Sequence, residues 1–412
     1  MKKLIILSSL FLVLTILGCQ KTTSNDTDSS TENENYRSEE DTDSSEISCT
    51  VVDTGQESCS NNTDKMKCPN KGKAFYGQDA QYVGNKLSYR DNGDGTVTDV
   101  NTGLMWQQDP GAKKSYEEAQ AGAQSFELAG HDDWRLPTIK ELYSLMDFRG
   151  IDPSSMNSAE GLRPYIDDEY FGFEYGDLST GDRIIDSQWA TSSVYNADVM
   201  NNQECFFGVN FADGRIKCYP TKRGKGYFTI YVRGDSYGEN NLVKNSDTIS
   251  DKSTGLTWMK QDSGSGMNWE DALAYCEDLE LDGKSDWRLP NAKELHSIVD
   301  YSRSPDATNS AAIDPLFEVS SITNEAGKKD YAFFWTSTTH ISERGYDRAA
   351  YIPFGRALGY MKEFGGWVDV HGAGAQRSDP KAGDPDEYPT GLGPQGDAIR
   401  IDNYVRCVRS EG

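Results

Sequence analysis

The segment Thr96-Val-Thr-Asp-Val-Asn-Thr-Gly-Leu-Met-Trp106 returns later in the chain as Thr248-Ile-Ser-Asp-Lys-Ser-Thr-Gly-Leu-Thr-Trp258. A second segment, Asp133-Trp-Arg-Leu-Pro-Thr-Ile-Lys-Glu-Leu142, returns as Asp286-Trp-Arg-Leu-Pro-Asn-Ala-Lys-Glu-Leu295. The repeats are offset by 152 and 153 residues. Solenoid repeats have periods of about 20–50 residues, whereas about 150 residues is an ordinary domain size. The sequence therefore predicts two tandem copies of one domain.

Both copies show the same order of predicted elements. Short β-segments come first, followed by a helix expected over residues 115–128 in the first copy and 268–279 in the second. The polar residue after Leu-Pro is expected to cap a second helix, over 139–146 and 292–299. Short strands close each copy, and we expect the last strand to return beside the first. The pattern predicts an α+β fold with two helices and short antiparallel strands in each copy.

The N-terminus has the features of a bacterial lipoprotein signal peptide. Lys2 and Lys3 precede an apolar run that is too short to span a bilayer. The run ends in Ile16-Leu-Gly-Cys19, which resembles a lipobox and implies cleavage before Cys19 and lipidation of its sulfur. Gln20 at the next position implies the outer membrane. We therefore expect a cell-envelope lipoprotein, exposed at the outer-membrane surface.

The chain divides into four predicted segments: the signal peptide (1–18), a lipid-anchored acidic tether (19–68), the first copy (69–238) and the second copy (239–412). The tether is expected to be disordered, because its Ser, Thr, Asn, Asp and Glu residues bury too little apolar surface to offset the entropy of ordering. The whole chain carries a net charge of −25. This charge argues against nucleic acid or anionic lipid headgroups as partners.

Comparison of the two copies predicts a disulfide. Cys276 aligns with Ala123 of the first copy, and Cys407 aligns with Gly234 when the closing strands are matched. Both cysteines are present in one copy and absent from the other, as expected of a bonded pair in an exported protein. We predict a bond between Cys276 and Cys407 that joins the first helix of the second copy to its last strand.

The other cysteines allow weaker inferences. Cys205 and Cys218 flank a hairpin, but a two-residue turn would place Cys218 opposite Val209, so this pair needs a bulge or another turn. Cys59 and Cys68 are close enough in sequence to pair. Cys49 is then the residue left over.

Several motifs together resemble the bacterial Lcl C-terminal domain family. They include Tyr76-Gly-Gln-Asp-Ala-Gln-Tyr82, Thr-Gly-Leu-Met-Trp106, Asp133-Trp-Arg-Leu-Pro-Thr138 and Tyr404-Val-Arg-Cys-Val-Arg409. The resemblance covers nearly everything after residue 68, in two copies. The arrangement is also similar to the C-type-lectin-like superfold, in which a first-helix Cys bonds a last-strand Cys. This similarity implies two tandem C-type-lectin-like domains.

The candidate ligand site is an irregular Gly- and Pro-rich stretch over residues 367–397. Its candidate residues are Trp367, Asp369, His371, Gln376, Asp379, Asp384, Asp386 and Asp397. Carboxylates and backbone carbonyls suit Ca²⁺, and an exposed Trp can stack on a sugar. The alternative is a solvated loop, because sugar-binding lectin signatures are missing; we therefore treat calcium as a candidate and assign no metal. The matching region of the first copy carries Arg215, Lys217, Lys222, Arg223 and Lys225 instead of acids.

The remaining candidate residues, including those repeated in both copies, have a structural interpretation. Trp134 and Trp287 recur at matched positions and are expected in the core. Arg135 and Arg288 beside them are expected to pair with nearby carboxylates. The four His residues show no zinc spacing and no Ser-His-Asp arrangement.

These observations favour a surface-exposed lipoprotein that acts as a binding or adhesion module for a glycan or protein ligand and is not an enzyme. One alternative is a passive structural protein of the envelope. A second is an enzyme of the formylglycine-generating type, which uses two late Cys residues; the second copy has only Cys407 there. Two copies on one tether would add avidity to a binding module.

Overall fold

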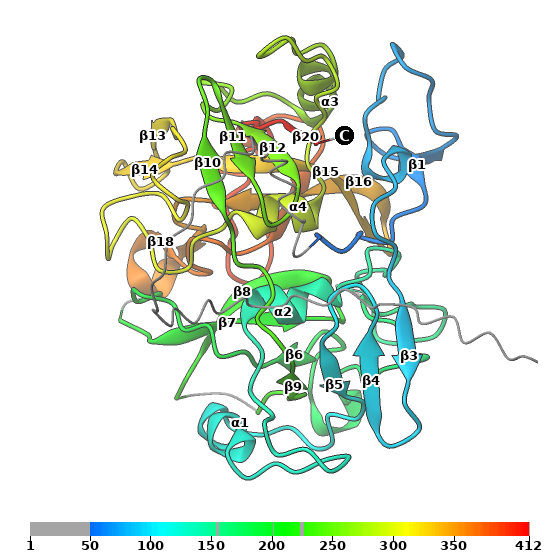
Figure 1. The fold of residues 1–412 in the computed structure, drawn as a ribbon. Helices are drawn as coiled ribbons and strands as arrows, with labels where there is room; N and C mark the ends of the chain where they lie inside the picture. The colour runs from blue at the N-terminus through cyan, green and yellow to red at the C-terminus, as the bar shows by residue number, and fades with distance from the viewer. Residues whose placement is uncertain (1–49, 154–155, 201, 223–225, 412) are drawn as a thin grey trace, which may run out of the picture.

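The computed structural model describes residues 50–411 except 154–155, 201 and 223–225. Cys19, Cys49 and the expected signal peptide lie outside the described residues. Figure 1 shows two halves packed against each other, with the first copy below and the second above. The described part of the chain is mostly β, with four short α-helices and several small sheets. Among these residues, no helix has the length and apolar character needed to cross a bilayer.

Each copy contains a four-stranded antiparallel sheet of the same order. In the first copy it runs β3 (Tyr89–Asp91), β4 (Thr96–Asp99), β5 (Met105–Gln107), β9 (Val232–Arg233). In the second copy it runs β10 (Leu242–Lys244), β11 (Thr248–Asp251), β12 (Leu256–Met259), β20 (Val408–Ser410). The closing strand thus joins this sheet beside its third strand, and the expectation that it lies beside the first was wrong.

A second antiparallel sheet also recurs. Its strands are β6 (Gln188–Trp189), β7 (Cys205–Asn210) and β8 (Arg215–Pro220) in the first copy, and β15 (Phe333–Ser342), β16 (Gly345–Pro353) and β19 (Arg377–Pro380) in the second. Three two-stranded ribbons complete the β-structure: β1 (Cys59–Ser60) with β2 (Lys65–Met66), β13 (Ser321–Thr323) with β14 (Lys329–Tyr331), and β17 (Leu358–Met361) with β18 (Gly366–Asp369).

The helices are those predicted, but each is shorter. They are α1 (Tyr116–Ala123), α2 (Ile139–Ser144), α3 (Trp269–Glu277) and α4 (Ala292–Ser297). Thr138 and Asn291, the residues after Leu-Pro, cap α2 and α4 by accepting a hydrogen bond from the backbone N–H three residues on. The expectation of two helices and short antiparallel strands in each copy is therefore confirmed.

The repeated Trp-Arg pair has the structural role expected of it. Trp134 and Trp287 are buried. The guanidinium of Arg288 forms two hydrogen bonds of 2.6 Å with the carboxylate of Glu294, and Arg135 forms the matching pair with Glu141 in the first copy. Each ion pair fixes the start of a second helix against the preceding loop.

The disulfide between Cys276 and Cys407 is confirmed, with their Cα atoms 5.5 Å apart. The Cys59–Cys68 and Cys205–Cys218 bonds also form. The last of these relies on a different turn, as anticipated: β7 and β8 are joined through residues 211–214, and Cys218 lies opposite Phe207.

The alignment behind the Cys276–Cys407 prediction was wrong by three residues at the closing strand. Strand β9 pairs with β5 as β20 pairs with β12, and this register places Tyr231, not Gly234, at the position of Cys407. The Tyr231 hydroxyl donates to the backbone oxygen of Ala119 in α1, at 3.0 Å. A hydrogen bond therefore joins helix and closing strand in the first copy, where the second copy has a disulfide.

The end of the expected tether is a folded part of the molecule. Residues 50–68, which we assigned to the tether, include the buried Val52 and Cys59. Gln56 exchanges two hydrogen bonds with the backbone of Thr339 in the second copy, and Ser60 lies 3.0 Å from the Thr339 hydroxyl. The prediction failed here because the segment gains order from contacts with the second copy, which its own polar composition does not reveal.

The two copies share one hydrophobic core. The largest buried cluster contains residues of both, including Leu142 of α2 and Leu295 of α4, and each copy adds a smaller cluster around its first helix. Tyr143 and His296, at matched positions, meet with ring centroids 4.5 Å apart. The copies are therefore packed as one folded unit.

Candidate functional site

A cleft lies where the second sheets of the two copies meet. Ile216 of β8 and Gln376, just before β19, exchange backbone hydrogen bonds of 3.2 and 3.3 Å. This bridge links the edge of β8 to the edge of β19 across the boundary between copies. Beside it lies a cavity of about 600 Å³, within the range of about 300–1,000 Å³ typical of ligand pockets.

The cleft is lined by charged side chains from both copies. The basic residues are Arg183, Arg215, Lys217, Arg344, Arg348 and Arg377. The acidic residues are Asp152, Asp213, Glu343 and Asp397. Six cations thus face four carboxylates in a chain whose net charge is −25. The cleft therefore has the opposite charge balance from the molecule as a whole.

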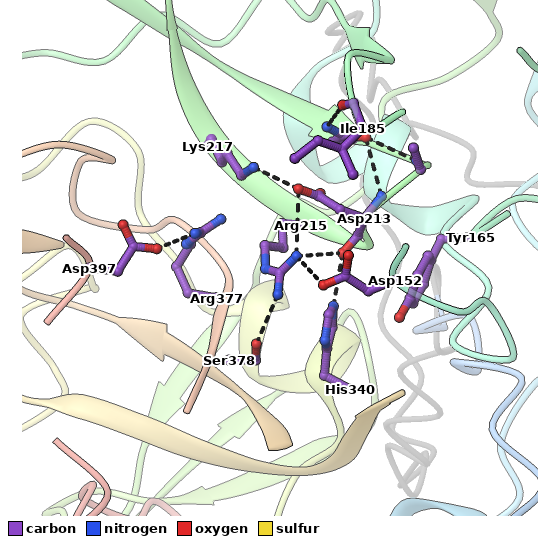
Figure 2. Close-up of polar contacts among 12 residues, drawn as sticks. Asp152, Tyr165, Ile185, Asp213, Arg215, Lys217, His340, Arg377, Ser378 and Asp397 are labelled. Atoms are coloured by element: carbon purple, nitrogen blue, oxygen red, sulfur yellow. Dashed lines mark hydrogen bonds and ion pairs between the residues drawn. The ribbon is translucent and has the colours of Figure 1, made fainter. Parts of the chain in front are cut away.

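Part of this charge is paired within the first copy, in a network that a residue of the second copy also contacts. Arg215 Nη1 lies 2.6 Å from Asp152 and 3.5 Å from Asp213, and Lys217 Nζ lies 2.7 Å from Asp213. The Nε2 atom of His340, from the second copy, lies 2.8 Å from the backbone oxygen of Asp213. Figure 2 shows this network around Asp213, with Lys217 on one side and His340 on the other.

The strand β8 places its basic residues by simple alternation. Successive side chains of a strand point to opposite faces, so Arg215, Lys217 and Tyr219 face the cleft, while Ile216 faces the core. Burial lowers the pKa of Lys217, and nearby Arg377 and Arg215 lower it further, against the opposing effect of Asp213. Positive charges from both copies are therefore close enough to repel one another.

A second ion pair lies on the opposite wall. The Nη2 atom of Arg377 binds Asp397, whose other oxygen lies 2.9 Å from His371 Nε2. Burial would raise the pKa of Asp397, but Arg377 and His371 outweigh it and hold that pKa well below its ordinary range. Burial and Arg377 lower the pKa of His371 to about 4. His371 is therefore neutral at pH 7, and Asp397 is the carboxylate that balances Arg377.

The structure separates the candidate calcium residues. Asp369 is buried and accepts hydrogen bonds from Tyr195 of the first copy and from the N–H of Gly372. Asp379 accepts from the N–H groups of Arg400 and Ile401. Each of these carboxylates is thus held by its own set of protein donors.

The remaining candidates also have separate roles. Asp384 accepts from the N–H of Asp386, and both are exposed. Trp367 packs against Tyr360 in the β17–β18 ribbon, with ring centroids 5.5 Å apart. Gln376 accepts from the Tyr143 hydroxyl at 3.3 Å. Within the described ranges, no three His, Cys, Asp or Glu side chains are placed to hold a metal ion. The structure therefore does not gather the candidate calcium residues into one group; His371 and Asp397 of that set line the cleft.

Sequence reasoning missed the main cleft residues. The sequence contrasts Arg215 and Lys217 with the acids of the second copy, but it does not show that the two regions meet in space. Arg348 lies in β16 and is not among the predicted site residues. The available signal was the alternation of basic and apolar residues along β8, but only the packing of the copies shows what that strand faces.

The repeated sheets, helices and shared core define a protein built from two copies of one domain. The sequence model of the Lcl C-terminal domain family matches residues 95–233 and, a second time, residues 247–368. These matches cover more than half of the chain, which therefore belongs to the Lcl C-terminal domain family and carries it in two tandem copies. No curated protein matches the chain. The second match ends before β19, so Arg377 and Asp397 lie beyond the matched region.

Proposed function

We propose that this protein is a lipid-anchored binding module, exposed at the outer-membrane surface, whose glycan or protein ligand binds in the cleft between its two copies. The observation that carries the proposal is the cleft of about 600 Å³. Both copies contribute its walls, so the duplicated arrangement itself creates the site.

The proposal includes a C-type-lectin-like fold for each copy. In its support, the disulfide of the second copy ties α3 to the segment that leads into β20. The proposed activity is binding and not catalysis. Cys407, the late Cys that a formylglycine-generating enzyme would need as a thiol, is consumed by that disulfide.

The proposed anchor rests on the lipobox that ends at Cys19. Cys19→Ser should move the protein from the membrane fraction to the soluble fraction, with residues 50–411 still folded. Retention of this variant in the membrane fraction would show that something other than the lipid holds the protein.

The binding proposal is tested with a glycan array probed with the full chain in detergent, with and without Ca²⁺. Leu392→Trp adds bulk to a cleft-lining residue that is 39% exposed, and Leu178→Trp is a matched control, 44% exposed and outside the cleft lining. We expect Leu392→Trp to abolish binding, and Leu178→Trp and calcium to leave it unchanged. Binding that survives Leu392→Trp would place the site elsewhere. The absence of any array or protein ligand would favour a passive envelope protein.

A further inference from the structure

We infer that the cleft takes a compact anionic ligand: a molecule of about one or two sugar units that carries a single negatively charged group. The inference rests on the proposed function and adds the chemical class of the ligand. It is carried by two cationic side chains: Arg348, which has no ion-pair partner among the described residues, and Arg377, whose guanidinium keeps two N–H donors without a hydrogen-bond partner.

Arg348 is a cation of the cleft that takes part in none of its ion pairs, although it acts electrostatically on the buried Asp379. It forms no ion pair with any described residue, and its Nη1 donates only to the backbone oxygen of Ser378, at 3.3 Å. Arg215 of the first copy donates from Nη2 to the Ser378 hydroxyl, also at 3.3 Å. Two guanidinium groups from different copies therefore meet at Ser378 on the cleft wall (Figure 2 shows the Arg215 contact).

Arg377 is paired with one carboxylate but keeps hydrogen-bond donors without a partner in the described part of the chain. The residue is 9% exposed and lines the cleft. Its Nη2 pairs with Asp397, but its Nε and Nη1 atoms, which are shielded from solvent, have no hydrogen-bond partner among the described residues. Buried donors are nearly always paired, and charged ones most of all. Burying donors without partners is costly, and an anion in the cleft would be attracted to their partial positive charge.

The remaining cations explain why the ligand should be compact. Arg215 and Lys217 are already paired with Asp152 and Asp213, so they position the wall and leave only a small excess of positive charge. The chain as a whole carries a net charge of −25, which repels any long polyanion that extends beyond the cleft. The cleft therefore suits one localised negative charge, either a carboxylate or a phosphate.

The test uses the full chain in detergent and isothermal titration calorimetry with three probes of similar size: glucuronate, glucose 6-phosphate and neutral glucose. We expect at least one anionic probe to bind at millimolar concentration or tighter, with affinity that falls as salt rises. Glucose should bind at least tenfold more weakly. A carboxylate and a phosphate ligand are distinguished by which of the two anionic probes binds.

The variant that tests the site is Arg348→Gln, because Arg348 is partly exposed and holds no carboxylate in place. We expect it to weaken the anionic probe about tenfold, the loss of one charge-assisted hydrogen bond. Arg90→Gln, an exposed arginine of β3 with no ion pair to any residue that the structure describes, should leave binding unchanged. If Arg348→Gln fails to fold, the salt dependence of anionic-probe binding to the wild-type protein still tests the inference.

Three outcomes would overturn the inference: no binding of either anion, equal binding of glucose, or equal loss in both variants. Different outcomes distinguish a failure of the proposed function from a failure of this inference. A neutral array ligand that Leu392→Trp excludes would retain the cleft and reject the anionic class, whereas an anionic ligand insensitive to Leu392→Trp would reject the cleft.

Discussion

Lys140 and Lys293 occupy matched positions in the two copies, and each donates a hydrogen bond to the backbone of the other copy. Lys140 Nζ lies 2.7 Å from the oxygen of Ser297, and Lys293 Nζ lies 2.7 Å from the oxygen of Ser144. Ser144 and Ser297 are themselves matched residues. The contact is therefore reciprocal, like that of a two-fold symmetric dimer, although both halves belong to one chain. This reciprocal contact holds α2 and α4 together, close to the shared core.

The reciprocal lysines should contribute measurably to stability. Lys140→Met or Lys293→Met keeps the apolar stem but leaves buried carbonyls without a donor. We expect each to lower the free energy of unfolding by about 1–3 kcal/mol, measured by urea denaturation. Lys244→Met, at an exposed position of β10, is the matched control and should cost little. Equal effects of all three substitutions would show that the reciprocal contact has no special weight.

The shared core predicts one cooperative unit. Leu142, Tyr143, Leu295 and His296 lie at the contact between copies, so a separated copy would expose apolar surface that is now buried. Calorimetry of the full chain should show a single unfolding transition. Fragments 69–238 and 239–412 should give poorly dispersed amide NMR spectra when isolated. Two resolved transitions, or two well-folded fragments, would contradict the shared core.

The first helix is joined to the closing strand by a disulfide in the second copy and by a hydrogen bond in the first. The disulfide should contribute more to the free energy of unfolding. Replacing both Cys276 and Cys407 by Ala opens a crosslink spanning 131 residues, which the chain-entropy account puts at up to about 5 kcal/mol. Tyr231→Phe removes the matching hydrogen bond of the first copy and should cost about 1 kcal/mol. Peptide mapping without reduction should recover the three disulfide pairs of the structure. A free thiol at Cys276 would exclude this account of the second copy.

The fold was largely predictable because the sequence contains two copies of the same domain. The repeated Leu-Pro-polar segment identified both second helices, and paired cysteines identified the long-range disulfide. The closing strand was misaligned because Tyr404-Val-Arg matches Tyr231-Val-Arg by letter, whereas the sheet register matches Tyr231 to Cys407.

The site was not predictable in the same way. The acidic stretch suggested a metal because its carboxylates are close in sequence, but Asp369 and Asp379 are each occupied by backbone and side-chain donors. The cleft depends on how one copy packs against the other. Nothing in the local pattern of Arg215 or Arg348 reveals that they lie near the same serine.

Asp369 should make stability depend on pH. Burial raises its pKa to about 7, against about 3.9 in an unfolded chain. The folded state therefore keeps this proton between about pH 4 and pH 7, and unfolding releases it. Its contribution should lower the free energy of unfolding as pH rises through that window, by up to about 4 kcal/mol.

The corresponding experiment compares urea denaturation of the wild type and Asp369→Asn at pH 5 and pH 8. The side chain at this position cannot ionise in the variant, so the stability of the variant relative to the wild type should increase as the pH rises. Asp386→Asn, an exposed acid of the same stretch, should show no such gain. If the difference in free energy of unfolding between the wild type and Asp369→Asn is the same at both pH values, Asp369 has an ordinary pKa.

The central claim, that ligand binds between the copies, is tested most directly by a crystal structure of the protein with the tightest ligand found by the array and the calorimetric probes. The account predicts ligand density in the cleft between β8 and β19, with an anionic group within hydrogen-bond distance of Arg348. Ligand density on the Tyr360–Trp367 ribbon, with an empty cleft, would contradict it.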